Sequence, residues 1–107
     1  MAKIEWTSEA TIVFGLYVKN ARAEFGVSTA KRWQQERKSV EWRLERYPTS
    51  YPFEELLRGR RFLYRCCHIM GGRFKLIYFY DPAKDTAYIV DIWDTRMSPK
   101  TLAKRVL

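Results

Sequence analysis

The residues best suited to chemistry in this sequence lie in a window without carboxylates. Residues 56–80 contain no Asp and no Glu, and their cationic side chains are Arg58, Arg60, Arg61, Arg65, Arg73 and Lys75. Clustered cations bind phosphate groups and can stabilise the charge that develops on a phosphoryl group during its transfer. The window therefore predicts a surface that binds a polyanion such as RNA or DNA.

The whole chain shares this bias toward positive charge. Its 107 residues include 20 Lys and Arg against 12 Asp and Glu, which gives a formal net charge of +8. A strongly basic small domain favours anionic partners, namely a nucleic acid, an acidic protein or a membrane surface. A positive charge that only keeps the chain in solution is the alternative interpretation.

The elements that must position these cations follow from hydrophobic periodicity, which changes from helical spacing to a period of two after residue 60. The predicted elements are a strand over 3–7, a helix from an N-cap at Ser8 to Gly26, a helix from a cap at Ser28 to Tyr47, strands over 61–69, 73–80 and 86–93, and a tail or short helix over 99–107. Helices that precede an antiparallel sheet are typical of α+β proteins. We therefore predict one α+β domain over residues 1–107, in which a helical hairpin packs on a β-α-α-β-β-β arrangement.

The turn between the first two strands of this sheet decides which cations share a face. A three-residue loop, Met70-Gly71-Gly72, would place Arg65, Lys75 and Arg73 on one exposed face and leave the apolar side chains on the other. A two-residue Gly71-Gly72 loop would instead place Arg65 opposite Tyr78 and mix charge with core on both faces. The three-residue loop is therefore predicted.

The last predicted strand adds two candidate residues. Tyr88, Val90 and Ile92 are expected to point to the core, which turns Trp93 outward. An exposed Trp93 offers a surface on which a base can stack, whereas the alternative is a rim residue covered by the C-terminal tail. Arg96 follows the strand and is expected at the rim of the basic face.

Two cysteines and the single histidine are consecutive in the sequence. Cys66 is expected in the core, and Cys67 is expected to point outward among cations, which would lower its pKa. His68 is expected on the core face as a structural residue. Adjacent cysteines are poorly placed to bridge each other, and no spaced Cys and His set exists, so we predict no disulfide, no metal site and no cofactor.

Cellular location is predicted from what the sequence lacks. No stretch approaches the 18 or so apolar residues of a membrane span, and residues 1–6 lack the apolar segment of a signal peptide. Together with unpaired cysteines, these observations favour a reducing cytoplasm and no membrane partner.

The sequence resembles the RelE/ParE superfamily of toxins from type II toxin–antitoxin systems, the plasmid-stabilisation type. The matching segments are Leu57-Arg58-Gly59, Tyr64-Arg65, residues 73–78, residues 88–92 and Asp94-Thr95-Arg96. Their order and spacing carry the resemblance, which spans almost the whole chain.

The resemblance implies a function and a set of site residues. RelE-like members are ribosome-dependent nucleases, also called mRNA interferases, which cut mRNA through its 2′-hydroxyl and bear basic residues on the sheet face. By position, Arg65, Lys75 and Arg96 look like the catalytic residues of this endoribonuclease. Binding of nucleic acid would then involve Arg58, Arg60, Arg61, Arg73 and Trp93.

One departure from the family pattern leaves alternatives open. Many RelE-type nucleases carry a Tyr or His near the C-terminus, and residues 97–102 contain neither. Glu54 or Glu55 could serve as a base, as a Glu does in one branch of the family, or could be a solvated loop carboxylate. ParE-like members, which inhibit DNA gyrase, lack the nuclease residues, and a catalytically inactive nucleic-acid-binding relative is a third possibility.

The resemblance also implies partners. The nuclease interpretation implies the ribosome and mRNA, whereas the ParE-like interpretation implies DNA gyrase. Both imply a cognate antitoxin of the RelB or ParD kind, which would hold the toxin inactive.

Overall fold

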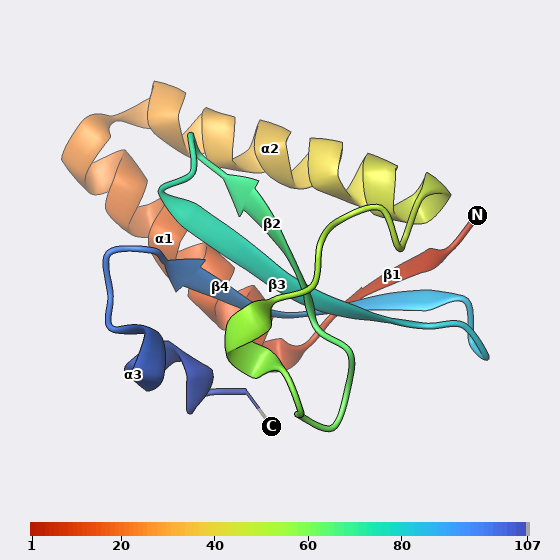
Figure 1. Ribbon diagram of the computed structural model, residues 1–107. Helices are drawn as coiled ribbons and strands as arrows, with labels where there is room; N and C mark the ends of the chain where they lie inside the picture. Colours follow the sequence, from red (N-terminus) through yellow and green to blue (C-terminus); the bar gives the residue numbers. More distant parts are fainter. Residues whose placement is uncertain (107) are drawn as a thin grey trace.

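The computed structural model describes residues 1–106, which build an α+β fold (Figure 1). Its elements are β1 (Lys3–Trp6), α1 (Ser8–Phe25), α2 (Val27–Arg46), the short 3-10 helix η1 (Glu55–Leu57), β2 (Arg65–Ile69), β3 (Phe74–Asp81), β4 (Thr86–Asp94) and α3 (Pro99–Ala103). The predicted order of one strand, two helices and three strands is confirmed. The tail forms the short helix α3, with Pro99 in its first turn.

The two long helices form a hairpin in which Gly26 is the single intervening residue. Gly26 has a φ of +99°, a backbone conformation that residues with a Cβ rarely adopt, so this reversal requires glycine. The capping predictions were each off by a residue or two. Thr7 caps α1 instead of Ser8, because its Oγ1 accepts a hydrogen bond from the Ala10 amide at 3.2 Å. Gly26 already occupies the cap position of α2, which Ser28 was predicted to fill.

The strands of residues 1–106 form one four-stranded sheet in the order β1-β4-β3-β2. β1 pairs with β4 in parallel, whereas the β4–β3 and β3–β2 pairs are antiparallel. The strand that comes last in the sequence is therefore an inner strand, held between β1 and β3. No helix in this part of the chain is both long and apolar enough to cross a membrane.

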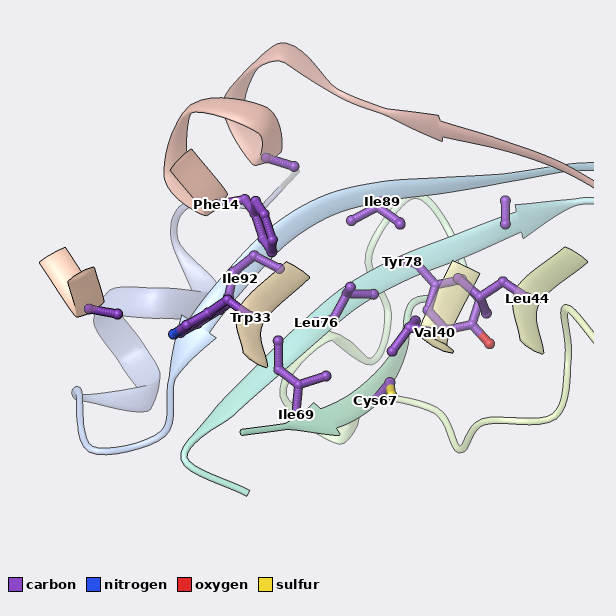
Figure 2. Close-up of a cluster of buried hydrophobic side chains, with 13 residues drawn as sticks. Phe14, Trp33, Val40, Leu44, Cys67, Ile69, Leu76, Tyr78, Ile89 and Ile92 are labelled. Carbon is purple, nitrogen blue, oxygen red and sulfur yellow. The ribbon is translucent and has the colours of Figure 1, made fainter. Parts of the chain in front are cut away.

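The helical hairpin covers one face of the sheet and forms the main core with it (Figure 2). Trp33 of α2 is part of this core and is 2% exposed. The centre of its ring lies 5.8 Å from that of Phe14, 5.6 Å from that of Tyr17 and 4.6 Å from that of Phe74. Tyr78 is fully buried in this core, as the sequence predicted, and its hydroxyl donates to the Pro48 carbonyl at 2.8 Å.

The opposite face of the sheet, called the helix-distal face below, carries Cys66, His68, Lys75, Ile77 and Trp93. Leu57 of η1 covers part of it together with Leu102 and Val106 of the C-terminal tail, and these side chains form a second apolar cluster with the sheet. Apolar side chains thus cover much of both faces of the sheet, and the helix-distal face also carries the polar residues His68, Lys75 and Asp91.

This second cluster explains why the predicted hairpin register is wrong. Arg65 pairs with Tyr78 and His68 pairs with Lys75, so the register is the one that was rejected for mixing charge with core. The turn spans residues 70–73, and three of them have positive φ, namely Met70, Gly71 and Gly72. That rejection assumed that the helix-distal face is exposed to solvent, but side chains from distant segments cover it.

A β-bulge reverses the alternation in β4. Ile77 pairs with Asp91 and Tyr78 pairs with Ile89, which leaves Val90 without a partner in β3. Ile89 therefore points to the helices, whereas Val90, which was predicted to point to the core, packs against the second cluster. Trp93 points to the helix-distal face. Trp93 is fully buried there in the cluster with the tail. Of the two interpretations of Trp93, the covered residue is correct and the exposed stacking surface is wrong.

Candidate functional site

Lys75 presents a fixed positive charge on the helix-distal face of the inner strand β3. Its side chain is 16% exposed and forms an ion pair with Glu54, whose side chain is 6% exposed. The Lys75 Nζ lies 5.4 Å from the centre of the Trp93 ring. A buried carboxylate and an aromatic face thus hold the ammonium group in one position.

The two glutamates before β2 have different environments. Glu54 is buried under Lys75, whereas Glu55 is exposed and lies 2.6 Å from Arg58 on the surface. The interpretation as a solvated loop carboxylate therefore fits Glu55 and not Glu54. Nothing in the local sequence separates the two, because only the fold brings Glu54 to β3.

Two basic segments border the helix-distal face. The first is the loop with Arg58, Arg60 and Arg61, and the second is the tail. The Arg60 guanidinium donates to the Val106 carbonyl at 2.8 Å, which holds the segments together. The tail adds cations that were not among the predicted site residues, namely Lys100, Lys104 and Arg105. The absence of any acid from residues 99–107 was the signal that could have identified them.

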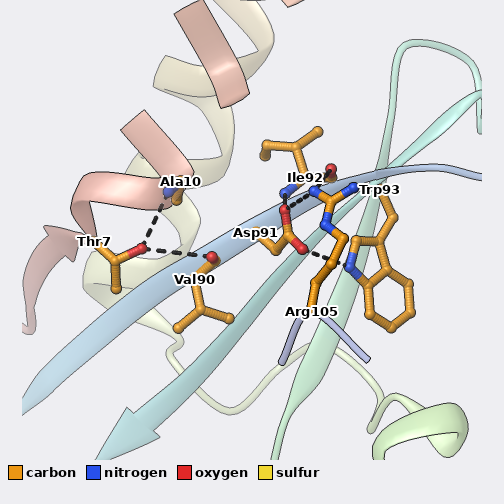
Figure 3. A network of polar contacts seen from close by, with 7 residues as sticks. All are labelled: Thr7, Ala10, Val90, Asp91, Ile92, Trp93 and Arg105. Carbon is orange, nitrogen blue, oxygen red and sulfur yellow. Dashed lines mark hydrogen bonds and ion pairs between the residues drawn. The ribbon is translucent and has the colours of Figure 1, made fainter. Parts of the chain in front are cut away.

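Arg105 fastens the tail to the sheet (Figure 3). Its guanidinium donates to the buried carboxylate of Asp91, which also accepts hydrogen bonds from the Ile92 amide at 2.8 Å and from the Trp93 indole at 2.9 Å. Each carboxylate oxygen of Asp91 is thus engaged, and the charge is compensated. The network fixes the tail against the strand that carries Trp93, and with it the border of the Lys75 site.

Arg65 does not share a face with Lys75, contrary to the prediction. It lies on the helical face, and its guanidinium donates to the carbonyls of Thr49 at 3.1 Å and Tyr51 at 2.7 Å. The guanidinium carbon also lies 4.1 Å from the centre of the Phe53 ring. These contacts fasten the loop between α2 and η1 to the edge of the sheet. His68 pairs with Lys75 and shares its face. Successive residues of a strand point to opposite faces, and Arg65 lies three residues before His68 on β2, so Arg65 lies on the other face.

Arg96 and Arg73 come together at another place, beyond the end of β4. They line a cavity of about 400 Å³ whose other polar lining includes Arg32, Glu24 and Asp94. Asp94 binds the Arg96 guanidinium through both oxygens, at 3.1 and 2.8 Å. This hydrogen bonding lowers the pKa of the Asp94 carboxyl. Arg96 lies at a rim, as predicted, but toward the helical hairpin.

The environments of Cys67 and His68 were predicted in reverse. Cys67 is buried in the main core, and burial raises the pKa of its thiol instead of lowering it. His68 is exposed on the helix-distal face, where it was expected to be part of the core. Cys66 is buried as predicted, and burial is also the largest cause of its raised thiol pKa. The one-residue difference in register accounts for both errors.

Both thiols are therefore expected to resist modification in the folded protein. The thiolate is the reactive form, and a raised pKa keeps each thiol protonated at neutral pH. In 5,5′-dithiobis(2-nitrobenzoate) at about pH 8 the native protein should release little chromophore, whereas the protein in denaturant should react at both cysteines. Rapid reaction of one thiol in the native state would contradict the burial of Cys67.

Comparison with known proteins gives no match to any protein-family model and none to a curated protein. Solved structures do match over nearly the whole chain. A chain from the chromosomal ParDE toxin–antitoxin system of P. aeruginosa matches with a TM-score of 0.69 and 15% identity, covering 88% of this chain and 96% of that chain. A metal-bound toxin from Helicobacter pylori gives 0.61 and 20%, covering 90% and 97%. The isolated E. coli RelE toxin gives 0.57 and 16%, covering 100% of both chains.

The chain has the fold of the RelE and ParE toxins. Within this RelE/ParE fold, the three cations predicted to form one catalytic cluster are distributed over both sides of the sheet. Lys75 is on the helix-distal face, Arg65 is on the helical face, and Arg96 lies beyond β4 beside the helical hairpin. The face that carries Lys75 is bordered by Arg58, Arg60 and Arg61, whereas Arg73 lies in the turn between β2 and β3.

Proposed function

We propose that this protein is a toxin of a type II toxin–antitoxin system that cleaves RNA on its helix-distal face. The observation that carries the proposal is the Lys75 side chain, which is 16% exposed, held by Glu54 and bordered by two basic segments. A cation fixed in advance stabilises the charge on a phosphorane without reorganisation during the reaction. The loop and tail cations would hold the RNA backbone on either side.

Arg96 is proposed as a second contact to the RNA. It is 61% exposed and follows β4, in which Trp93 pairs with Lys75. Its bidentate contact with Asp94 would hold the guanidinium for a bidentate contact with phosphate once RNA displaces the carboxylate. Arg65 is proposed only to position the loop that carries Glu54, since its guanidinium donates to carbonyls of that loop.

RNA binding is expected to weaken steeply with salt, because bound cations release counterions from the phosphates. With about four phosphate contacts, affinity for single-stranded RNA should fall roughly 50-fold between about 50 and 200 mM KCl. Fluorescence anisotropy with a labelled RNA measures this slope. An affinity that is flat over this range would contradict the role of the basic segments.

A cognate antitoxin of the RelB or ParD kind is proposed as the partner that keeps the protein inactive. The fold supports this, because a solved chain that shares it belongs to a ParDE toxin–antitoxin system. Co-expression of a short neighbouring open reading frame should restore growth to cells in which this protein is induced. Harmless expression of the chain alone would count against a toxin.

Inhibition of DNA gyrase is the second candidate function. One observation favours it: all three predicted catalytic cations already have partners in the protein. Lys75 is paired with Glu54, Arg96 with Asp94, and Arg65 with backbone carbonyls. Inducing the protein in cells and following mRNA integrity and plasmid supercoiling in parallel separates the two. RNA cleavage predicts broken mRNA with normal supercoiling, and gyrase inhibition predicts the reverse.

A further inference from the structure

We propose that His68 is the general base of this site and accepts the proton of the attacking 2′-hydroxyl group. The inference rests on the RNA cleavage proposed above and adds a residue to it. It assigns a function to the one histidine of the chain, which lies on β2, far in sequence from the C-terminal segment.

The pairing of β2 with β3 brings the imidazole to the site. His68 is directly opposite Lys75 in this antiparallel pair, so both side chains project from the same face. Directly opposite residues have Cβ atoms about 4.5–5.5 Å apart. Both side chains thus start from neighbouring positions on one face, and the proposal requires a phosphate bound by the ammonium of Lys75 to meet the His68 ring. His68 is exposed, which leaves its ring free to meet RNA.

The other ionisable groups that flank Lys75 on this face are poorly suited to accept that proton. Glu54 is buried and already bound to Lys75. Burial raises the pKa of the Cys66 thiol, nearby Glu54 raises it too and Lys75 lowers it, so the thiol stays protonated at neutral pH. Asp91, farther along the same face, is buried and bound by Arg105. Histidine exchanges protons near neutral pH, which suits a general base.

The reaction balances with these groups alone. The 2′-oxygen attacks the adjacent phosphorus as its proton passes to the neutral imidazole of His68, and the bond from phosphorus to the 5′-oxygen breaks. Lys75 neutralises the charge on the pentavalent phosphorus. The departing 5′-oxygen takes a proton from water, and the hydroxide so formed removes the proton from the imidazolium. The products are a 2′,3′-cyclic phosphate and a 5′-hydroxyl group.

The test compares the intact protein with His68→Gln and His68→Ala on ribosomes programmed with a defined mRNA. Loss of a general base costs about 100-fold to 10,000-fold in rate. Added imidazole should restore part of the activity of His68→Ala, which a purely structural role would not allow.

The outcomes separate this inference from the proposed function. If His68→Gln keeps the wild-type rate while a variant without the Lys75 charge is inactive, His68 is not the base and RNA cleavage stands. If the wild-type protein cleaves no RNA, the proposed function fails and the inference fails with it. A loss of rate in His68→Ala that imidazole does not rescue would also overturn the role of base.

Discussion

Removing the charge of Lys75 should lower the rate of RNA cleavage by about 100-fold or more, which is the usual cost of one well-placed electrostatic contact to a transition state. The variant to use is Lys75→Gln combined with Glu54→Gln. Removing the lysine alone would leave the buried carboxylate of Glu54 without its partner, which destabilises proteins by several kcal/mol. Two amides preserve a hydrogen-bonded pair without charge. Single-turnover cleavage of ribosome-bound mRNA is the measurement.

Lys84→Gln is the matched control for this experiment. It removes the same charge from an exposed position in the turn between β3 and β4. The control should cleave RNA at close to the wild-type rate and keep its toxicity. If the double variant is folded by circular dichroism and still cleaves RNA at the rate of the control, Lys75 has no part in catalysis.

Truncating Trp33 should have the largest effect on stability, because the main core is built around its ring. The side chain is 2% exposed and lies against the rings of Phe14, Tyr17 and Phe74. Trp33→Ala should lower the free energy of unfolding by about 3–5 kcal/mol, the usual cost of removing a large buried aromatic side chain. Urea unfolding followed by circular dichroism measures the difference.

The matched control is Trp42→Ala on the same helix. Trp42 is 55% exposed, and its ring lies 4.1 Å from the guanidinium carbon of Arg46. Losing this surface contact should cost no more than about 1 kcal/mol. Equal destabilisation by the two substitutions would show that the helical hairpin does not pack on the sheet as described.

Periodicity predicted the helices and strands because each is encoded by its own residues. The spacing of Trp33, Val40 and Leu44 places these side chains on one face of α2, and all three are buried. The fold class followed from the order of these elements. Local sequence was sufficient here since each helix buries a stripe that its own residues define.

The register and the site were harder to predict because distant segments decide them. The residues that cover the helix-distal face are Leu57, Leu102 and Val106, which lie outside the strands. Without them, a register that pairs Arg65 with Tyr78 and His68 with Lys75 appeared inconsistent. Lys75 was predicted to lie on an exposed face, and its side chain is only 16% exposed. Its carboxylate partner and the exposed imidazole opposite it on β2 depend on contacts that no local pattern reveals.

The parallel pairing of β1 with β4 also affects how the chain folds during synthesis. β1 leaves the ribosome well before its partner β4, because the two helices and two other strands are made between them. Because β4 is an inner strand, a nascent chain that has not yet reached it has β1 without a partner and β3 with one edge unpaired. Pairing between distant segments is also slow to form. The helical hairpin can form early, but the complete sheet, and any toxicity that depends on it, arises only after β4 has been synthesised.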